Sequence, residues 1–246
     1  IDGVISGAGT LLKQGTGDLN LTAANTFTGD VFIDEGKVIV SDISGDALDA
    51  GAIRLGGNVP NSDLEATLEL GNAAGNVTVD QTIVVRADAD AANNDINAFI
   101  VSTDNDNTLS GNIAMDGELS INAANAAGSL TLDGSTLELK SQRLLVTGPG
   151  EVIINNTMSS TDTSGDLLKQ GTGIVTLNAA NTFSGDVFID EGTVAVTAAD
   201  PLASSTINMG ALSGSANTVL HLNNTTAVNV DQNINVRDTG GSKTIQ

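Results

Sequence analysis

Residues 11–37 recur almost unchanged at residues 167–193, so the chain is built by repetition. The two segments read LLKQGTGDLNLTAANTFTGDVFIDEGK and LLKQGTGIVTLNAANTFSGDVFIDEGT, and 21 of their 27 positions are identical at an offset of 156. An internal repeat of this kind predicts a fold in which similar units stack on one another and bury their apolar faces against their neighbours.

The repeat extends beyond these two segments. The sequence VDQTIVVR at 79–86 returns as VDQNINVR at 230–237, at an offset of 151. Together the matches define a unit of 151–156 residues, so we expect a first complete unit at residues 1–156 and a second, truncated unit at 157–246. A weaker copy at 116–140 shares the pattern apolar-x-apolar-x-Ala-Ala-Asn, which indicates that shorter repeats are nested inside the long one.

The local pattern is all β. Apolar and polar residues alternate over short runs, as in Leu130-Thr131-Leu132, and alternation places one face of a strand inward and the other outward. Gly, Asn and Asp separate the runs, and Gly and Asn suit turns that need positive φ. We expect strands at 10–14, 19–22, 30–33, 37–40, 53–55, 67–70, 76–79, 83–86, 98–101, 118–121, 129–132, 136–139 and 151–154.

Short strands at this spacing also fit an antiparallel sandwich. The unbroken pattern over the whole chain favours a right-handed parallel β-helix, a β-solenoid in which like residues stack as ladders along the axis. The best helical stretch, at 87–97, fits a loop better than a helix.

Composition narrows the function classes. The formal net charge is −21, from 30 acidic and 9 basic residues, and aromatic residues make up 2% of the chain. Nucleic-acid binding needs basic patches and stacking aromatics, so we expect no nucleic-acid partner. No apolar stretch approaches a membrane helix, so we expect no transmembrane segment. The start, IDGVISGAGT, has no basic signal region, and we expect a segment of a longer protein.

The repeated pattern resembles a known family. Residues 15–40 and 171–196 combine Gly-x-Gly, Ala-Ala-Asn-Thr-Phe-[Ser/Thr]-Gly and Ile-Asp-Glu-Gly-x-Val, and this combination is similar to the autotransporter-associated, or passenger-associated, β-strand repeat. The resemblance implies a parallel β-helix in a large secreted or surface-displayed protein of a Gram-negative-type bacterium. It also implies a structural or adhesive role, and the repeat marks the scaffold rather than the ligand.

Within the motif, most residues have a structural interpretation. Asn side chains in such positions close turns or stack as ladders, and the Phe rings are expected in the core or in cap packing. The structural motif residues are Asn25, Phe27, Gly29, Gly36, Asn181, Phe183, Gly185 and Gly192, with Phe32 and Phe188 beside them.

The acidic turns Asp34-Glu35 and Asp190-Glu191 are expected to be exposed. A second interpretation is a calcium site, because carboxylates and carbonyls in a turn suit a hard cation. Asp88–Asp95 and Asp104–Asn107 are expected to be acidic loops and are similar candidates. None matches a known calcium loop, so we expect no cofactor, with calcium as the alternative.

No catalytic constellation is visible, and we expect no enzyme. The single histidine, His221, stands at an expected outward strand position without an evident partner, and Trp and Tyr for sugar stacking are absent. The favoured function is a non-enzymatic extracellular stalk with a structural or adhesive role, whose partners are neighbouring repeats, further copies or a surface receptor. Two alternatives remain open: a filament that stacks head to tail, and a calcium- or ice-binding solenoid.

Overall fold

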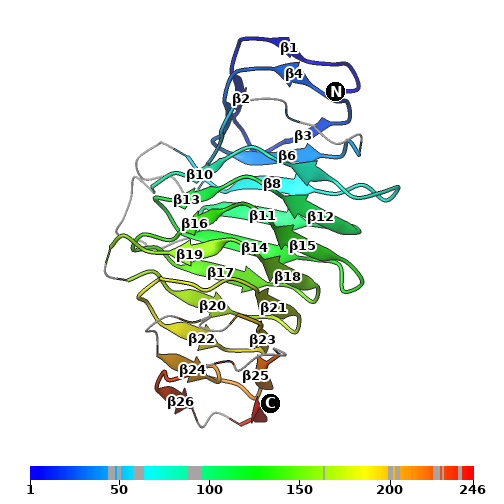
Figure 1. Ribbon diagram of the computed structural model, residues 1–246. Helices are drawn as coiled ribbons and strands as arrows, with labels where there is room; N and C mark the ends of the chain where they lie inside the picture. The colour runs from blue at the N-terminus through cyan, green and yellow to red at the C-terminus, as the bar shows by residue number, and fades with distance from the viewer. Residues whose placement is uncertain are drawn as a thin grey trace.

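The computed structural model describes residues 1–43, 48, 51–57, 64–87, 96–162, 164–198, 202, 206–223, 228, 230–237 and 240–246. Every residue in a regular element lies in a β-strand, and the strands coil into a three-sided solenoid (Figure 1). Within these residues, no helix is long and apolar enough to cross a membrane. The acidic segment 88–95 lies outside the described residues.

Three long sheets form the sides of the solenoid. The seven-stranded sheet contains β2 (Leu11–Lys13), β5 (Val31–Ile33), β7 (Ile53–Leu55), β10 (Ile83–Val85), β13 (Ile113–Met115), β16 (Thr136–Glu138) and β19 (Thr157–Ser159). The ten-stranded sheet contains β3 (Asp18–Leu21), β6 (Gly36–Val40), β8 (Ala66–Leu70), β11 (Ala98–Ser102), β14 (Leu119–Ala123), β17 (Leu144–Thr147), β20 (Leu167–Lys169), β22 (Val187–Ile189), β24 (Ile207–Met209) and β26 (Ile234–Val236).

The eight-stranded sheet contains β9 (Thr78–Val79), β12 (Asp106–Leu109), β15 (Ser129–Leu132), β18 (Glu151–Ile154), β21 (Ile174–Leu177), β23 (Gly192–Val196), β25 (Thr218–Leu222) and β27 (Lys243–Ile245). A two-stranded sheet of β1 (Ser6–Gly7) and β4 (Thr26–Phe27) lies at the N-terminal end.

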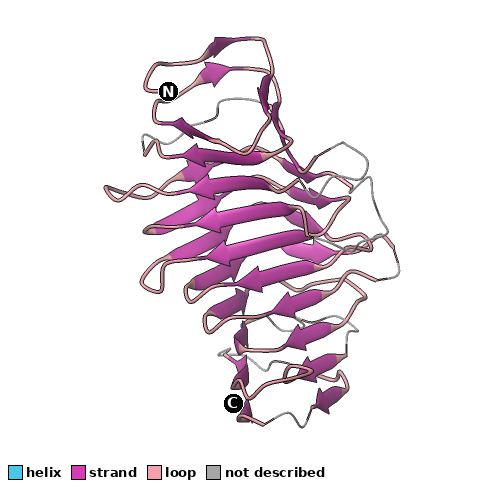
Figure 2. Ribbon diagram, turned by 180° about the vertical axis from the view of Figure 1, so that it is seen from behind, coloured by secondary structure: helices cyan, strands magenta, loops and turns pink. Residues whose placement is uncertain are grey.

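All strand pairs in the described residues are parallel and in register. Each strand therefore lies directly over the strand one turn earlier, and Figure 2 shows the stack from behind as a continuous series of rungs. This confirms the predicted parallel β-solenoid and excludes the antiparallel sandwich. The sheets run across residue 156 without a break, because β17 pairs with β20 and β18 pairs with β21.

The core follows from the alternation. In a strand such as β8, the burial pattern alternates strictly, with Ala66, Leu68 and Leu70 inside and Thr67 and Glu69 outside. Leu68 stacks between Val38 and Ile100 of the neighbouring turns, and all three are 0% exposed. Aliphatic ladders of this kind fill the narrow interior of the solenoid.

One predicted loop is partly a strand. Residues 104–107 were expected as an acidic loop, but Asp106 and Asn107 begin β12. Asn107 is fully buried, its amide nitrogen donates to the Asp104 carbonyl at 2.6 Å and its Oδ1 accepts from the Val77 amide at 2.7 Å. The buried side chain thus forms hydrogen bonds with backbone groups of its own turn and of the preceding rung. The sequence around Asn107 is polar, and for this reason the segment was predicted to be a loop.

The two copies of the repeat lie on different sides of the solenoid. The LLK segment of the first copy is β2 in the seven-stranded sheet, whereas that of the second copy is β20 in the ten-stranded sheet. The seven-stranded sheet runs from β2 to β19 through six successive strand pairings. The next strand in the chain, β20, belongs to the ten-stranded sheet on the adjacent side. Equivalent residues of the two copies therefore face different directions.

Candidate functional site: two duplicated turn clusters

The lysine of each LLK segment points into the solenoid, although strand alternation usually reserves inward positions for apolar residues. Lys13 ends β2 and is 7% exposed, and Lys169 ends β20 and is 1% exposed. A buried ammonium needs hydrogen-bond acceptors, because leaving the charge unpaired inside a protein is costly.

Backbone carbonyls of two turns supply these acceptors. Lys169 Nζ donates to the carbonyl oxygens of Gln170 at 2.8 Å, Gly171 at 2.5 Å and Glu191 at 3.3 Å. In the first copy, Lys13 Nζ likewise donates to the carbonyls of Gln14, Gly15 and Glu35. Each lysine thus joins the Gly-Thr-Gly turn of its own rung to the Asp-Glu-Gly turn of the next rung.

The glycine of each Asp-Glu-Gly turn leaves room for the ammonium. Gly36 and Gly192 have φ of 75° and 79°, in the left-handed region that favours glycine. A Cβ on Gly192 would lie 2.5 Å from the carbonyl oxygens of Gly171 and Gly173 and 2.9 Å from Lys169 Nζ. The repeat therefore needs glycine here for both backbone conformation and space.

The aspartate of the same turn is held by side chains from two other rungs. Asp34 accepts from Gln14 Nε2 at 3.2 Å and from Arg86 Nη2 at 2.5 Å. In the second copy, Asp190 accepts from Gln170 Nε2 at 3.2 Å and from Arg237 Nη1 at 3.3 Å. We call these groups the first turn cluster (Lys13, Gln14, Asp34, Glu35 and Arg86) and the second turn cluster (Lys169, Gln170, Asp190, Glu191 and Arg237).

Each arginine reaches across an intervening rung. Gly56 lies between Asp34 and Arg86 in the stack, because its amide donates to the Ile33 carbonyl and the Arg86 amide donates to the Leu55 carbonyl. Gly56 has no side chain to block the guanidinium, and Gly210 occupies the same position before Arg237. The arginine therefore ties together three successive turns at one corner of the solenoid.

The second phenylalanine of the repeat lies outside the core, which corrects the expectation for Phe32 and Phe188. Their strands point Val and Ile inward and leave both rings half-buried on the outer face. The guanidinium carbon of Arg86 lies 5.7 Å from the Phe32 ring centroid, and that of Arg237 lies 5.1 Å from the Phe188 centroid. At this distance, the ring contributes a cation–π contact to the turn cluster.

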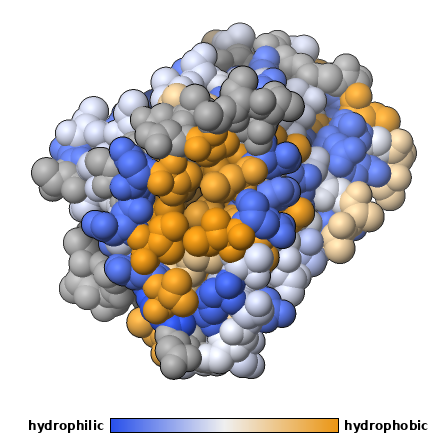
Figure 3. All heavy atoms as spheres, turned by 60° about the horizontal axis from the view of Figure 1, so that its bottom comes forward, coloured by the Kyte–Doolittle hydropathy of each residue, from blue (hydrophilic) through white to orange (hydrophobic). Residues whose placement is uncertain are grey.

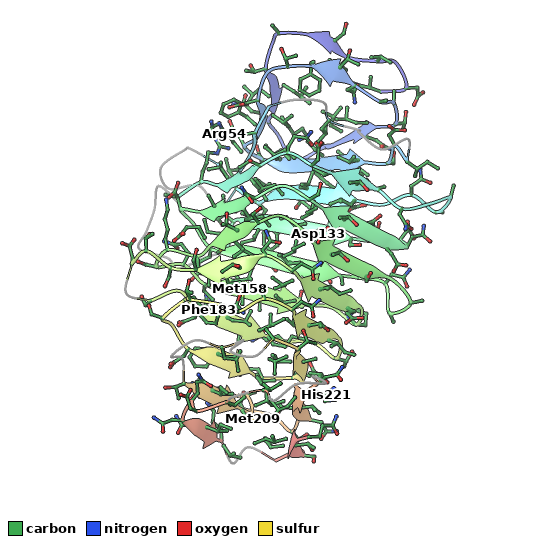
Figure 4. All side chains as sticks on the ribbon, in the orientation of Figure 1. Arg54, Asp133, Met158, Phe183, Met209 and His221 are labelled. Carbon is green, nitrogen blue, oxygen red and sulfur yellow. The ribbon has the colours of Figure 1, made fainter. Side chains whose placement is uncertain are left out.

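The remaining motif residues are buried within the Ala-Ala-Asn-Thr-Phe segment. Phe27 and Phe183 are 2% and 0% exposed. Asn181 Oδ1 accepts from the Met158 amide and the Thr182 amide donates to the Met158 carbonyl, both at 2.8 Å. This segment thus continues the stack below β19 without a regular strand, and Figure 4 shows Phe183 just below Met158.

Asn25 has the same role in the first copy, where its Oδ1 accepts from the Ile5 amide at 2.9 Å. Gly29 and Gly185 lie so close to the carbonyls of Gly9 and Gly165 that a Cβ would overlap them. These residues preserve the distance between rungs.

The four weak calcium candidates lie in the turn clusters and are half-buried rather than exposed. The aspartates face arginine and glutamine, and Glu35 Oε2 accepts from the Gly15 amide at 3.0 Å. Among the described residues, no group of three or more histidine, cysteine or acidic side chains is arranged to hold a metal. Calcium binding at Asp34, Glu35, Asp190 and Glu191 stays a prediction.

Sequence reasoning did not identify the lysines and arginines of the clusters. The signal was present, because Lys13 and Lys169 are identical at the offset of 156 and Arg86 and Arg237 at the offset of 151. A charged residue kept in both copies at an inward strand position indicates a buried polar contact. The clusters hold neighbouring turns together, and most of their hydrogen-bond donors and acceptors are used within the fold.

Comparisons with known proteins agree with this description. Residues 11–40 and 167–196 match the model of the passenger-associated-transport-repeat. No curated protein and no solved structure matched the chain. The molecule is a β-solenoid, and each of the two segments that match this repeat contains the lysine and the aspartate of a turn cluster.

A glycine substitution tests the space that the second turn cluster requires. We expect Gly192→Ala to lower the free energy of unfolding by about 1–3 kcal/mol more than Gly214→Ala. Both residues have positive φ, but a Cβ on Gly214 meets nothing within 4 Å. Urea unfolding followed by circular dichroism measures the difference, and equal losses would show that the turn cluster tolerates a side chain.

The pH dependence of stability tests the burial of Lys169. Burial lowers the pKa of Lys169 from 10.5 to about 8, and the charge of Glu191 opposes this change. Between these two pH values, the unfolded chain binds more protons than the folded chain, so the contribution of Lys169 to the free energy of unfolding rises with pH.

We therefore expect the stability of the wild type to increase relative to that of Lys169→Met between about pH 8 and pH 10.5. Urea midpoints measured across this range provide the comparison. Parallel curves for the two proteins would contradict the lowered pKa of Lys169.

Proposed function

We propose that this chain is a non-enzymatic segment of a rigid extracellular stalk with a structural and adhesive role. The observation that carries the proposal is the uninterrupted parallel stacking of rungs, in which each turn is hydrogen-bonded to the next on more than one side. Such an array extends in one dimension and presents its side chains along a long surface.

The repeat family supports an extracellular setting. The name of the matching family, passenger-associated-transport-repeat, refers to exported passenger segments. We propose on this basis that the chain is secreted or displayed on the surface of a Gram-negative-type bacterium. The net charge of −21 favours solubility for a protein that consists of sheets.

The turn clusters support the stalk role. Each cluster joins neighbouring rungs at a corner through buried or half-buried charges, so bending the solenoid there would separate paired groups. A stalk needs this resistance to bending, whereas an isolated globular domain does not.

A distance measurement tests the stalk. Leu12 and Leu212 are 53% and 84% exposed and lie near opposite ends of the stack. Because successive rungs lie about 4.8 Å apart, the distance between spin labels at these two positions should have one narrow distribution centred at roughly 40 Å. Pulsed electron paramagnetic resonance measures it, and a broad distribution would show that the solenoid bends or opens and is unsuited to a stalk.

End-to-end stacking into filaments is a second candidate function. In Figure 3, apolar residues gather in the centre of the face at the β26–β27 end, with hydrophilic residues beside them. Val236 is 63% exposed and Ile245 is 50% exposed. Among the described strands, β26 and β27 have a parallel neighbour on one side, and their other edge could pair with a further rung, such as one from a second copy.

Charged substitutions on this end test the filament. We expect the wild type to form larger assemblies as its concentration rises, and Val236→Lys with Ile245→Lys to remain monomeric, because the charges would be buried in the contact. Sedimentation velocity measures the assemblies, with Ile174→Lys as the control, because Ile174 is 41% exposed and lies inside the stack on β21, between β18 and β23. A wild type that stays monomeric throughout would contradict the filament.

A further inference from the structure

A hollow of about 490 Å³ lies on the outer face of the seven-stranded sheet. Its volume falls in the usual range for small-molecule sites. Val84 of β10 forms part of its floor, and Ala114 of β13 continues the same outward row. Because these side chains are small, the surface sinks between the longer side chains of Arg54 and Glu138, which flank them in the row.

The turn after β16 forms one wall. The backbone N–H of Gln142 donates to the Leu139 carbonyl at 2.9 Å. Ser141 and Gln142 line the hollow. Lys140 has a φ of 50°, an uncommon conformation for a residue with a side chain. This turn brings the lysine to the hollow beside Asp116, with which it pairs.

The hollow brings three cationic side chains together on an acidic protein, and each of them also pairs with an aspartate. Of the 9 lysine and arginine residues in the chain, three line it: Arg54, Arg86 and Lys140. Two carboxylates, Asp116 and Asp162, also line it. Among the described residues, the lining therefore has three cations and two carboxylates, and Asp30 and Asp34, which pair with the two arginines, are not part of it. The chain as a whole has 21 more negative than positive charges.

Both arginines have hydrogen-bond donors that the fold does not use. Arg54 donates from Nε to Asp30 at 2.7 Å, and within the described residues its two terminal nitrogens have no partner. Arg86 uses Nη2 for Asp34 and the Ile33 carbonyl, and its Nε is buried, so Nη1 is the donor that it has left for a ligand. A guanidinium carries five N–H donors, so the terminal nitrogens of both arginines can donate to a further anion.

We propose that this hollow binds a carboxylated sugar unit. The carboxylate would lie against Arg54, Arg86 and Lys140, because guanidinium groups form paired, charge-assisted hydrogen bonds with carboxylates. Asp162, Ser141 and Gln142 would receive the sugar hydroxyls, which both donate and accept. The mixture of cations with carboxylate, hydroxyl and amide groups fits an acidic sugar better than a simple anion such as phosphate.

The overall negative charge of the protein does not prevent this binding. The screening length at physiological salt is about 8 Å, so distant acids on other faces contribute little at the hollow. The nearby acids Asp30 and Asp34 are already paired with the arginines.

The second copy of the repeat lacks the same arrangement. Asn208 stands opposite Phe188, where Arg54 stands opposite Phe32 in the first copy. The binding site is therefore a property of one copy and of its following turns, and it goes beyond the stalk function that both copies share.

Nuclear magnetic resonance titration of the labelled protein tests the proposal. D-glucuronate should give saturable shifts in residues 84–87 and 140–142, and the matched neutral sugar D-glucose should give none. Arg54→Gln and Lys140→Gln should each weaken glucuronate binding by about tenfold or more, because each removes a charge-assisted donor. Lys37→Gln removes a cation on another sheet and should leave the affinity unchanged.

Equal shifts with both sugars, or no shifts with either, would overturn the proposal. An equal loss in all three variants would also overturn it, because that result would reflect overall charge. The spectrum of each free variant reports folding, and Arg54→Gln and Lys140→Gln change different rungs, so one misfolded variant does not decide the outcome. The stalk is judged separately by the distance between Leu12 and Leu212.

Discussion

The structure depends on parallel, in-register stacking of inward aliphatic side chains. Because each strand lies directly over the strand one turn earlier, the side chain that fills the interior in one rung also supports its equivalents above and below, as Val38, Leu68 and Ile100 do. Any rung that shifted by one residue would turn its apolar side chains outward. The turns must therefore hold register while their lengths vary, and the turn clusters and buried asparagines serve this purpose.

Register at the corners explains why charged residues recur inside an apolar stack. Lys13 and Lys169 satisfy carbonyls that point away from the sheets, and Arg86 and Arg237 join turns two rungs apart. The most faithful part of the sequence repeat is thus the part that fixes corner geometry. The outer faces are free to differ, and the hollow beside Arg54 illustrates how one copy can acquire a surface that the other lacks.

Much of the fold could be predicted from the sequence, because alternation specifies strands and repetition specifies stacking. Strands 53–55, 129–132 and 151–154 agree with the structure at both ends. The buried Asn107, the outward Phe32 and the inward Lys13 were not predicted, since their environments come from neighbouring rungs rather than from local pattern. The sequence also did not predict that the second copy lies on another side of the solenoid. The side on which a copy begins depends on how many strands precede it.

The position of β20 tests this account most directly. Spin labels at Leu145 and Leu168, which are outward residues in register on β17 and β20, should show strong dipolar broadening, since adjacent strands lie about 4.8 Å apart. Broadening between Leu168 and Ser159 of β19 instead would place the second copy on the same side as the first, and would contradict the account.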